Sequence, residues 1–438
     1  MESSFASLSC AARSEIVCIQ SDCKSSRTGC MAQSGKPVVV GGGGLGGMSA
    51  ALGLGRSGIP CILLEQADTI GAIGYGIQLG PNVFWALQAL GVAKAVLAKA
   101  HVPPAILALD ARDGSEILRI PTGDEFHSRF VHPYVVIHRV DLHEILVEAC
   151  RQLPNVELRT GVAAEAVSQD GDGVRVLTSG GMVEAQAFVA ADGIHSRFRP
   201  QVVSRNAAPQ PSGFAAHRTT VPRSSLAPHL FHREVILWAG DGFHIVAYPL
   251  RGETLYNVVA VFRTATFAER KNADAYRQEV QHTYRDAHPD MKALLALMDL
   301  ERRWPISDQV PTRQWTRGRV ALLGDSAHAT LQSLAQGAGM AIEDAVCLTN
   351  CLVGDPDVEA ALQRYARLRH LRTARVQLES RQLWEMYHCG GIAADVRRDT
   401  FAHRSAREYY DCLAWLYDNP AAAMAMPDEV GVQQRETA

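Results

Sequence analysis

The chain has 438 residues, of which 47% are hydrophobic, so it can form two or three domains with large cores. Its net charge is −3, and it has neither a run of lysine and arginine nor an apolar run of the ~18 residues that cross a membrane. A nucleic-acid partner and a membrane span are therefore not expected. Its ten cysteines do not have the spacing of a small disulfide-linked scaffold, which indicates reduced thiols in a cytoplasmic protein.

The first residues of the chain are rich in serine and show no hydrophobic periodicity. They also lack the charged region and apolar core of a secretory signal, so residues 1–35 are predicted to be a disordered leader, with Met31 as an alternative start. This segment contains Cys10, Cys18, Cys23 and Cys30. Their gaps match no zinc-ligand spacing and no histidine lies among them, so no metal site is expected.

Residues 36–68 predict a strand, a glycine turn, a helix and a second strand. The G-x-G-x-x-G fingerprint falls on Gly42, Gly44 and Gly47, with Gly41 and Gly43 as an alternative register offset by one residue. The second strand ends at Glu65, 23 residues after the first glycine, where a dinucleotide fold places the acid that binds a ribose. Glycines let the backbone approach a pyrophosphate, and the helix N-terminus stabilises its charge. This combination predicts binding of an adenine dinucleotide.

Strands and helices continue to alternate after this unit. A nearly uncharged, glycine-rich loop precedes a helix that starts near Pro81, and a strand with a following helix has Arg139 at their junction. Two further strands lie near residues 156 and 188. Residues 208–310 predict a β-sheet followed by helices, and the chain is mostly helical from about residue 351. The pattern predicts an α/β fold.

A third motif, "GDSAHATLQSLAQGAGMAIEDA", begins at Gly324. It follows the predicted strand "VALL", so Asp325 lies at the carboxyl end of a strand, where open α/β sheets bind ligands. Gly337 and Ala338 begin a predicted helix, whose free N–H groups and dipole suit a negative charge.

Three segments carry a resemblance to a known family: "GGGGLGG", "AADGIHSRFR" and "ALLGDSAHATLQSLAQGAGMAIEDA". In this order they resemble the group A, single-component FAD-dependent aromatic hydroxylases, over about residues 36–420. The resemblance implies a Rossmann-like FAD-binding domain with an inserted mixed β-sheet substrate domain and C-terminal helices. The implied FAD-binding domain is discontinuous, comprising residues 36–106, 138–207 and 311–350. Residues 107–137 and 208–310 form the implied substrate domain, and residues 351–438 the C-terminal helical region.

The same resemblance implies how FAD is held. Asp325 accepts a hydrogen bond from a ribityl hydroxyl, Arg139 lies near the ribose and phosphate, and Gln78 lies beside the isoalloxazine. Asp192 is expected to be mostly structural and to hold the turn at Gly193. NADH is the expected co-substrate, with NADPH left open. The chain has one dinucleotide fingerprint rather than two, which favours a hydroxylase of this family, where NAD(P)H docks transiently, over a reductase with separate FAD and NAD domains. Ser326 and Ala329 depart from the usual "GDAAHP" of the family, and their effect is open.

The predicted strand "GFHIVAYPL" supplies candidates for substrate chemistry, because His244, Val246 and Tyr248 share one face. Together with Gln332 in "LQSLAQGAG", it resembles family members that hydroxylate 3-hydroxybenzoate at carbon 6, giving 2,5-dihydroxybenzoate (gentisate). The resemblance places His244 near the phenol, Tyr248 at the acid or ring, and Gln332 near the hydroxylated carbon, with Tyr134 as a weaker pocket candidate. Oxygen transfer to the ring is easier once the phenol has lost its proton, and histidine is suited to accept it.

Other interpretations stay open. His244 on its own is also consistent with a hydrogen-bonded strand histidine that has no catalytic role. The nearest alternative function is a decarboxylating salicylate 1-hydroxylase, which makes catechol; a more distant one is a non-flavin NAD-binding dehydrogenase or a binding protein. The expected partners are a small aromatic acid and O2, with a homodimer as a candidate assembly.

Overall fold

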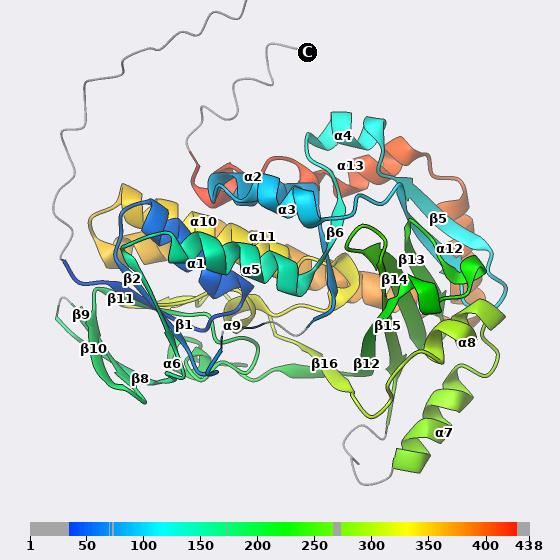
Figure 1. The fold of residues 1–438 in the computed structure, drawn as a ribbon, viewed down its shortest axis with the longest axis horizontal. Coiled ribbons are helices and arrows are strands. Elements are labelled where there is room, and N and C mark those ends of the chain that lie inside the picture. The colour runs from blue at the N-terminus through cyan, green and yellow to red at the C-terminus, as the bar shows by residue number, and fades with distance from the viewer. Residues whose placement is uncertain (1–34, 70, 72–73, 172, 266–272, 427–438) are drawn as a thin grey trace, which may run out of the picture. The chain divides into compact units, whose positions relative to one another are not determined.

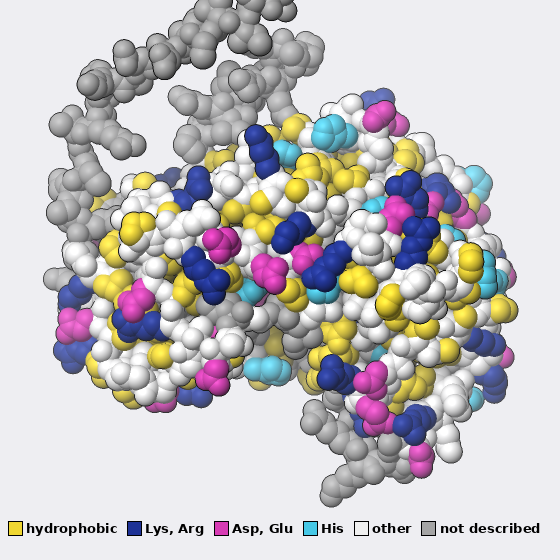
Figure 2. Space-filling view, in the orientation of Figure 1, with side chains coloured by type: hydrophobic (Ala, Val, Ile, Leu, Met, Phe, Trp, Pro, Cys, Tyr) yellow, Lys and Arg dark blue, Asp and Glu magenta, His cyan; other side chains and the backbone are white. Residues whose placement is uncertain are grey.

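The computed structural model describes residues 35–69, 71, 74–171, 173–265 and 273–426. The predicted leader, except for Gly35, and its four cysteines lie outside the described residues. No helix within these ranges is both long and apolar enough to cross a membrane. Figure 2 shows acidic and basic side chains interspersed on the face in view, without a dominant patch of one sign.

A six-stranded sheet forms the first layer of the fold (Figure 1). Its order is β17 (Thr316–Arg317), β18 (Val320–Leu322), β11 (Ala187–Ala190), β1 (Val38–Gly41), β2 (Cys61–Glu65) and β7 (Val156–Thr160). All neighbouring strands are parallel except β17 and β18. The central strands β1 and β11 are buried throughout, as their uninterrupted apolar sequences predict for strands covered on both faces.

Helices cover this sheet. Helix α1 (Leu45–Arg56) packs against α5 (Arg139–Arg151) and α10 (Gly337–Gly354), and α10 packs against the long α11 (Val358–Tyr387). Figure 1 shows these four helices as neighbouring, roughly aligned ribbons beside the six-stranded sheet. Because α1 follows β1 directly and α10 follows the β18 loop, the N-termini of both helices lie near the carboxyl ends of parallel strands.

A seven-stranded mixed sheet forms the second large unit. Its order is β16 (Trp304–Asp308), β12 (Gln210–Pro222), β15 (Leu255–Arg263), β14 (Phe243–Leu250), β13 (Val235–Gly240), β4 (Ala105–Asp110) and β5 (Glu116–Pro121). Its pairs are antiparallel except β13 with β4. One face packs against α7 (Ala273–Thr283) and α8 (Pro289–Leu295) in an aromatic core that includes Phe262, Tyr276 and Tyr284. The opposite face is therefore free to line a cavity.

Smaller elements complete the described chain. A three-stranded sheet contains β8 (Ala164–Asp170), β9 (Gly173–Thr178) and β10 (Gly181–Ala185), and a two-stranded one contains β3 (Gly76–Leu79) and β6 (Val135–His138). The remaining helices are α2 (Pro81–Ala89), α3 (Ala93–Lys99), α4 (Asp124–Phe130), α6 (Arg199–Val202), α9 (Asp325–His328), α12 (Gly391–Ala402) and α13 (Ala406–Tyr417). The mixed α/β fold agrees with the sequence, whereas the division into domains stays a prediction.

Candidate active site

A cavity of about 800 Å³ lies between the two large sheets. One wall comes from the glycine turn, the Asp325 loop and the N-terminus of α10, and the other from the seven-stranded sheet. Gly44, Asp325 and His244 all line this one space, although they are far apart in the sequence. The candidate residues that line it are Gly44, Gln78, Tyr134, Arg139, His244, Tyr248, Asp325, Gln332, Gly337 and Ala338, whereas Gly42, Gly47, Glu65 and Asp192 do not.

The glycine turn between β1 and α1 is in close contact with backbone atoms of the turn itself and of Ala191. Gly42 has φ +116°, and a Cβ there would lie 2.3 Å from the carbonyl oxygen of Ala191. A Cβ on Gly47 would lie 1.9 Å from the carbonyl oxygen of Gly42. Gly44 has open space where its side chain would be, at the N-cap of α1. The turn therefore requires glycine at its first and last fingerprint positions, and its middle position is open toward the cavity.

Glu65 stabilises this turn from the end of β2. Its carboxylate accepts hydrogen bonds from the backbone N–H groups of Gly43, at 2.8 Å, and Ala67, at 2.9 Å. The side chain lies beside the cavity rather than on its wall. The acid is thus at the carboxyl end of the strand, adjacent to the glycine turn, as its spacing in the sequence predicts.

Asp325 and Arg139 bring opposite charges into the same cavity. The Asp325 carboxylate is accessible to the cavity but enclosed by protein, and this loss of water raises its pKa. Burial likewise lowers the pKa of Arg139. No hydrogen bond or ion pair involving either side chain occurs within the described part of the chain. A Cβ on Gly337 would lie 3.8 Å from the carboxylate, so the first turn of α10 also borders this acid.

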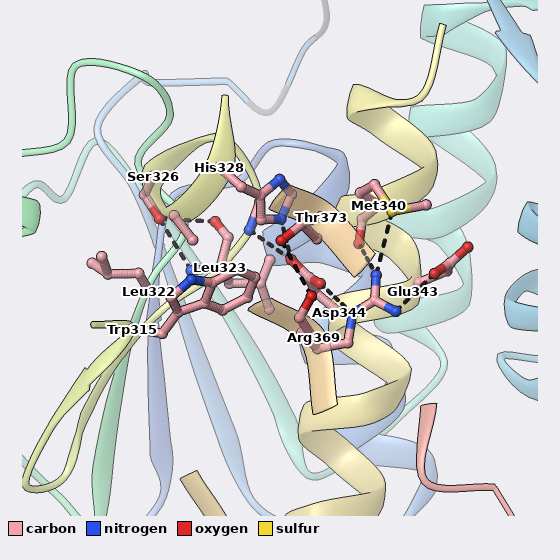
Figure 3. Close-up of polar contacts among 12 residues, drawn as sticks. Trp315, Leu322, Leu323, Ser326, His328, Met340, Glu343, Asp344, Arg369 and Thr373 are labelled. Atoms are coloured by element: carbon pink, nitrogen blue, oxygen red, sulfur yellow. Dashed lines mark hydrogen bonds and ion pairs between the residues drawn. The ribbon is translucent and has the colours of Figure 1, made fainter. Parts of the chain in front are cut away.

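A buried polar cluster holds the Asp325 loop (Figure 3). The two carboxylate oxygens of Asp344 accept hydrogen bonds from Nε2 of His328, at 2.5 Å, and from Nε of Arg369, at 2.7 Å. Asp344 also accepts a bond from the backbone N–H of Gly324 at 3.1 Å. Glu343 binds Nη1 of Arg369 at 2.7 Å. The cluster fixes the loop against α10 and α11 through compensated charges.

Ser326, one of the two departures from the family sequence, ties the same loop to the sheet. Its hydroxyl oxygen lies 2.6 Å from the carbonyl oxygen of Ala190 at the end of β11 (Ser326 is labelled in Figure 3). From the other side, the buried guanidinium of Arg199 donates to the carbonyl oxygens of Ser326, at 2.9 Å, and Ala327, at 2.7 Å. The loop is therefore anchored by a hydroxyl and a cation at its first turn. Sequence analysis missed the role of Arg199, whose only sign is its place in "HSRFR".

The second wall is built from residues that lie directly opposite one another on neighbouring strands. In order, the row is Leu118 on β5, Ala108 on β4, Leu237 on β13, Val246 on β14, Val259 on β15 and Arg218 on β12. The residues next to them along each strand, such as Leu107 and Trp238, face the core formed with α7 and α8, because side chains alternate between the two faces of a sheet. The wall therefore changes from apolar to cationic at β12.

Polar side chains stand above and below this row. On β14, His244 and Tyr248 flank Val246 and are almost fully buried. The Tyr134 hydroxyl donates a hydrogen bond to the Gln78 amide oxygen at the β3–β6 edge of the cavity. Loss of water raises the pKa of Tyr248 and Tyr134 and lowers that of His244 well below its usual value, so all three are neutral near pH 7.

Comparison with known proteins agrees with this geometry. Residues 36–380 match the model of a family described as an FAD binding domain. The chain is 40% identical over 383 residues to 3-hydroxybenzoate 6-hydroxylase of Polaromonas naphthalenivorans (strain CJ2), covering 87% of this chain and 95% of that protein. The chain belongs to the group A FAD-dependent aromatic hydroxylases.

Solved structures share the fold of the hydroxylase. A salicylate hydroxylase substrate complex has a TM-score of 0.71 and 25% identity, covering 90% of this chain and 99% of that one. The Klebsiella pneumoniae protein HpxO, complexed with FAD and uric acid, has a TM-score of 0.77 and 24% identity, covering 90% of this chain and 98% of that one. The hydroxylase is thus an FAD-dependent monooxygenase of established fold.

Two further placements concern residues near the hydroxylase cavity. Asp192 lies outside it and accepts a hydrogen bond from the backbone N–H of Arg197 at 2.8 Å, while its neighbour Gly193 lines the cavity. Arg218, which sequence analysis missed, lies on the cavity wall and donates to the Gln332 amide oxygen at 2.7 Å. No carboxylate pairs with Arg218 among the residues that the structure describes. Its partner is 114 residues away, so no local pattern could have found it.

Proposed function

We propose that the hydroxylase converts 3-hydroxybenzoate to 2,5-dihydroxybenzoate, using NADH and O2. The observation that carries the proposal is a single wall with two kinds of recognition: a cation, Arg218, that has no carboxylate partner among the described residues, and a neutral histidine, His244. An aromatic acid with a phenol group has one partner for each. The relative from Polaromonas naphthalenivorans that carries this activity in its name supports the same substrate.

The residues of the first wall fit FAD. The open side of Gly44 at the start of α1 and the N-terminus of α10 offer backbone N–H groups to phosphate and to a reduced flavin ring. Asp325 and Arg139 have unused hydrogen-bonding capacity for hydroxyl and phosphate groups. When bound, FAD would supply the redox chemistry, namely acceptance of a hydride from NADH and activation of O2 for transfer of one oxygen atom to the ring.

Arg218 is suited to hold the substrate carboxylate. Arg218 is half-buried and has lost part of its water, and a bound carboxylate compensates for that loss through charge-assisted hydrogen bonds. Gln332 lies beside it, and the resemblance places this glutamine near the carbon that is hydroxylated. In 3-hydroxybenzoate, carbon 6 is next to the carbon that bears the carboxylate. Recognition of the acid by Arg218 therefore brings one of the two neighbouring ring carbons to Gln332, and the position of the phenol at His244 decides between carbon 2 and carbon 6.

His244 is suited to accept the phenol proton. Its lowered pKa leaves the ring neutral near pH 7, with a nitrogen available as a proton acceptor. Loss of the proton pushes electron density to the carbon para to the oxygen, which is carbon 6. The enclosing wall of apolar residues and Tyr248 excludes water from this step. Tyr134 and Gln78 are proposed to close the pocket on the β3–β6 side.

The proposal also covers the oligomeric state of the protein and its location in the cell. We propose a homodimer in the cytoplasm. Ile392 and Val396 lie four residues apart on α12 with exposed side chains, and such an apolar face is suited to contact a second copy.

The test is product identification. The purified protein, saturated with FAD, is supplied with NADH and O2 and with each of several hydroxybenzoates in turn. We expect 3-hydroxybenzoate to stimulate NADH oxidation and to yield gentisate, with close to one gentisate per NADH consumed. Catechol from salicylate, with no gentisate from 3-hydroxybenzoate, would replace the proposed reaction with the decarboxylating one.

A further inference from the structure

The row of opposed residues on the seven-stranded sheet is longer than a substrate site requires. It begins at Arg218 on β12 and ends at Leu118 on β5. Neighbouring strands lie about 4.8 Å apart, so the two ends of the row are separated by about 24 Å. A hydroxybenzoate is far shorter than that. The outer part of the row is therefore available for something other than holding the bound acid.

The last helices of the chain cover the outer end of the row. Helices α12 and α13 both pack on β5 (Figure 1). Phe401, near the end of α12, packs against the apolar cluster that contains Ala108 and Leu237. The hydroxyl of Tyr409 on α13 donates a hydrogen bond to the carbonyl oxygen of Phe401 at 2.9 Å. Phe401, Tyr409 and Leu413 all line the cavity, which thus continues along the row as far as these two helices.

The cavity reaches the surface at this end. The exposed residues of its lining are Asp325, Gln382, Arg404 and Cys412. Asp325 belongs to the wall that fits FAD, so bound cofactor would cover it. Arg404 lies in the turn between α12 and α13, and its Nη1 lies 4.0 Å from Sγ of Cys412 on α13. Arg404 and Cys412 therefore mark an opening of the cavity that bound FAD leaves free.

Arg404 gives this opening a positive charge. Its guanidinium lies over the ring of Phe401, 5.1 Å from the ring centre, and no carboxylate pairs with it among the described residues. The nearby carboxylates have other partners. Glu408 is engaged in the capping box at the N-terminus of α13, and Glu379, which lines the cavity on α11, binds Nε of Arg375 at 2.6 Å. The row thus has a cation at each end.

We propose that the aromatic acid enters the cavity at this opening, drawn by Arg404, and reaches Arg218 along the row. This inference rests on the proposed function, because it concerns the substrate of that reaction. An uncompensated positive charge at an opening raises the local concentration of an anion and its rate of entry. The side chains of Leu118, Ala108 and Leu237 then offer the ring an apolar surface without hydrogen bonds that would retain it on the way.

A residue on an entry route differs in its kinetic effect from a residue that binds the substrate. Phe401, which lies beneath Arg404, packs three or four strand spacings from Arg218, or roughly 15–20 Å along the sheet. At an ionic strength of about 0.15 M the Debye length is about 8 Å, so the bound acid is screened from Arg404. The dissociation constant then stays constant when Arg404 is changed. Association and dissociation change by the same factor, because the acid leaves by the route through which it enters.

The first experiment changes the charge at the opening. The FAD-loaded protein is mixed with 3-hydroxybenzoate without NADH, and the absorbance change of the flavin gives the two rate constants. We expect Arg404→Glu to slow association and dissociation about fivefold each at about 0.15 M ionic strength, and the difference to vanish at about 1 M, where the Debye length is about 3 Å. Arg404→Lys should behave as the wild type.

The matched control is Arg407→Glu, an exposed arginine on α13 that does not line the cavity. It makes the same change of charge and should leave both rate constants at their wild-type values. Equal slowing in Arg407→Glu, or wild-type rate constants in Arg404→Glu, would show that Arg404 does not draw the acid in. A change in the dissociation constant alone would make Arg404 part of the binding site rather than of a route.

The second experiment obstructs the opening. A bulky maleimide on Cys412, or the variant Cys412→Trp, places a large group beside Arg404. We expect either one to slow binding of the acid at least tenfold at every ionic strength. Cys412→Ser treated with the same maleimide keeps all other cysteines and is compared with its own untreated form, which it should match. Unchanged rates in both Cys412→Trp and the modified wild type would overturn entry at this opening.

The two proposals fail on different observations. Binding is measured without turnover, so absence of gentisate removes the proposed reaction and leaves the entry measurement valid for an aromatic acid that perturbs the flavin spectrum. Gentisate formation together with wild-type binding rates in the Arg404 and Cys412 variants would retain the proposed function and remove the route.

Discussion

Two arginines of this hydroxylase, one buried and one half-buried on the cavity wall, differ in their hydrogen-bond partners. Arg369 is 0% exposed and binds the carboxylates of Glu343 and Asp344, each at 2.7 Å. Arg218 lies on the cavity wall, and within the described part of the chain its hydrogen-bond partner is the neutral amide of Gln332. Both lose water, but only the first is compensated by charge.

The difference separates structure from recognition. A fully paired buried cation holds its neighbours in one arrangement and leaves nothing for a ligand. A cation on a cavity wall that is bonded to one amide keeps most of its N–H donors available. A bound anion can accept these hydrogen bonds and compensate the positive charge. The cluster around Arg369 therefore stabilises the Asp325 loop, and Arg218 is the candidate for binding the substrate carboxylate.

Loss of Arg369 should have the largest effect. Arg369→Met leaves Glu343 and Asp344 buried without their shared cation, so the free energy of unfolding should fall by about 3–5 kcal/mol. Chemical denaturation of the FAD-loaded protein measures it. Arg367→Met, at an exposed position on the same helix, should stay within about 0.5 kcal/mol of the wild type. Equal free energies of unfolding for the two variants would show that Arg369 does not stabilise the fold through its buried carboxylates.

Loss of Arg218 should be smaller and should fall on binding. Arg218→Met is expected to raise the KM for 3-hydroxybenzoate about 100-fold while stability stays the same or rises, since Arg218 has lost part of its water without gaining a carboxylate partner among the described residues. The wild type should also discriminate against 3-hydroxybenzamide, and the variant should not. Arg223→Met, just beyond β12 and paired with Glu253 at the surface, is the matched control. A KM that stays unchanged would transfer carboxylate recognition to another residue.

The smallest expected difference between the Arg369 and Arg218 variants is in the pH at which acid unfolds the protein. Burial raises the pKa of Glu343 and Asp344. For Glu343, Arg372 and Arg369 outweigh this effect, and for Asp344 the hydrogen bonds and charge interactions with His328 and Arg369 do so, with the result that the pKa of each carboxyl group lies below its ordinary value. Such groups stabilise the fold above their unfolded pKa near 4 and cease to do so as pH falls through the lower folded value. Arg369→Met raises both folded values, so acid unfolding should begin about one pH unit higher.

Fluorescence during acid titration provides the measurement. Arg218→Met should unfold at the same pH as the wild type, because Arg218 pairs with no carboxylate among the described residues. A shift in Arg218→Met equal to that in Arg369→Met would show that both cations contribute to stability in the same way.

Sequence reasoning worked best where the chemistry is local. The strand, glycine turn and helix around Gly42–Gly47, and the acid at Glu65, lie within 30 residues of each other, so spacing alone predicts their arrangement. The strand with His244 and Tyr248 on one face was also predictable from its alternation. The catalytic and binding roles of these residues stay predictions.

What was missed depends on distant partners or weak patterns. Nε2 of His388 lies 2.8 Å from Nδ1 of His244 although 144 residues separate them, and Arg369 lies 25 or 26 residues from its carboxylates on another helix, so neither pairing has a sequence signature. The strands β8–β10 were not predicted either, although β9 alternates buried and exposed residues as a half-buried strand does. Helix α4 has only seven residues, too few for a helical pattern to stand out.

The row of opposed residues on the seven-stranded sheet has a consequence for how new specificities arise. Each position belongs to a different strand, and the backbone ladder that aligns them does not depend on the side chains. Single substitutions can therefore change the shape of the substrate pocket at one strand at a time, for instance by enlarging Ala108 between its two leucine neighbours. The residues that are predicted to hold the cofactor lie on other elements and stay unchanged. Substrate specificity can therefore evolve on this scaffold while the residues that serve the reaction with oxygen are kept.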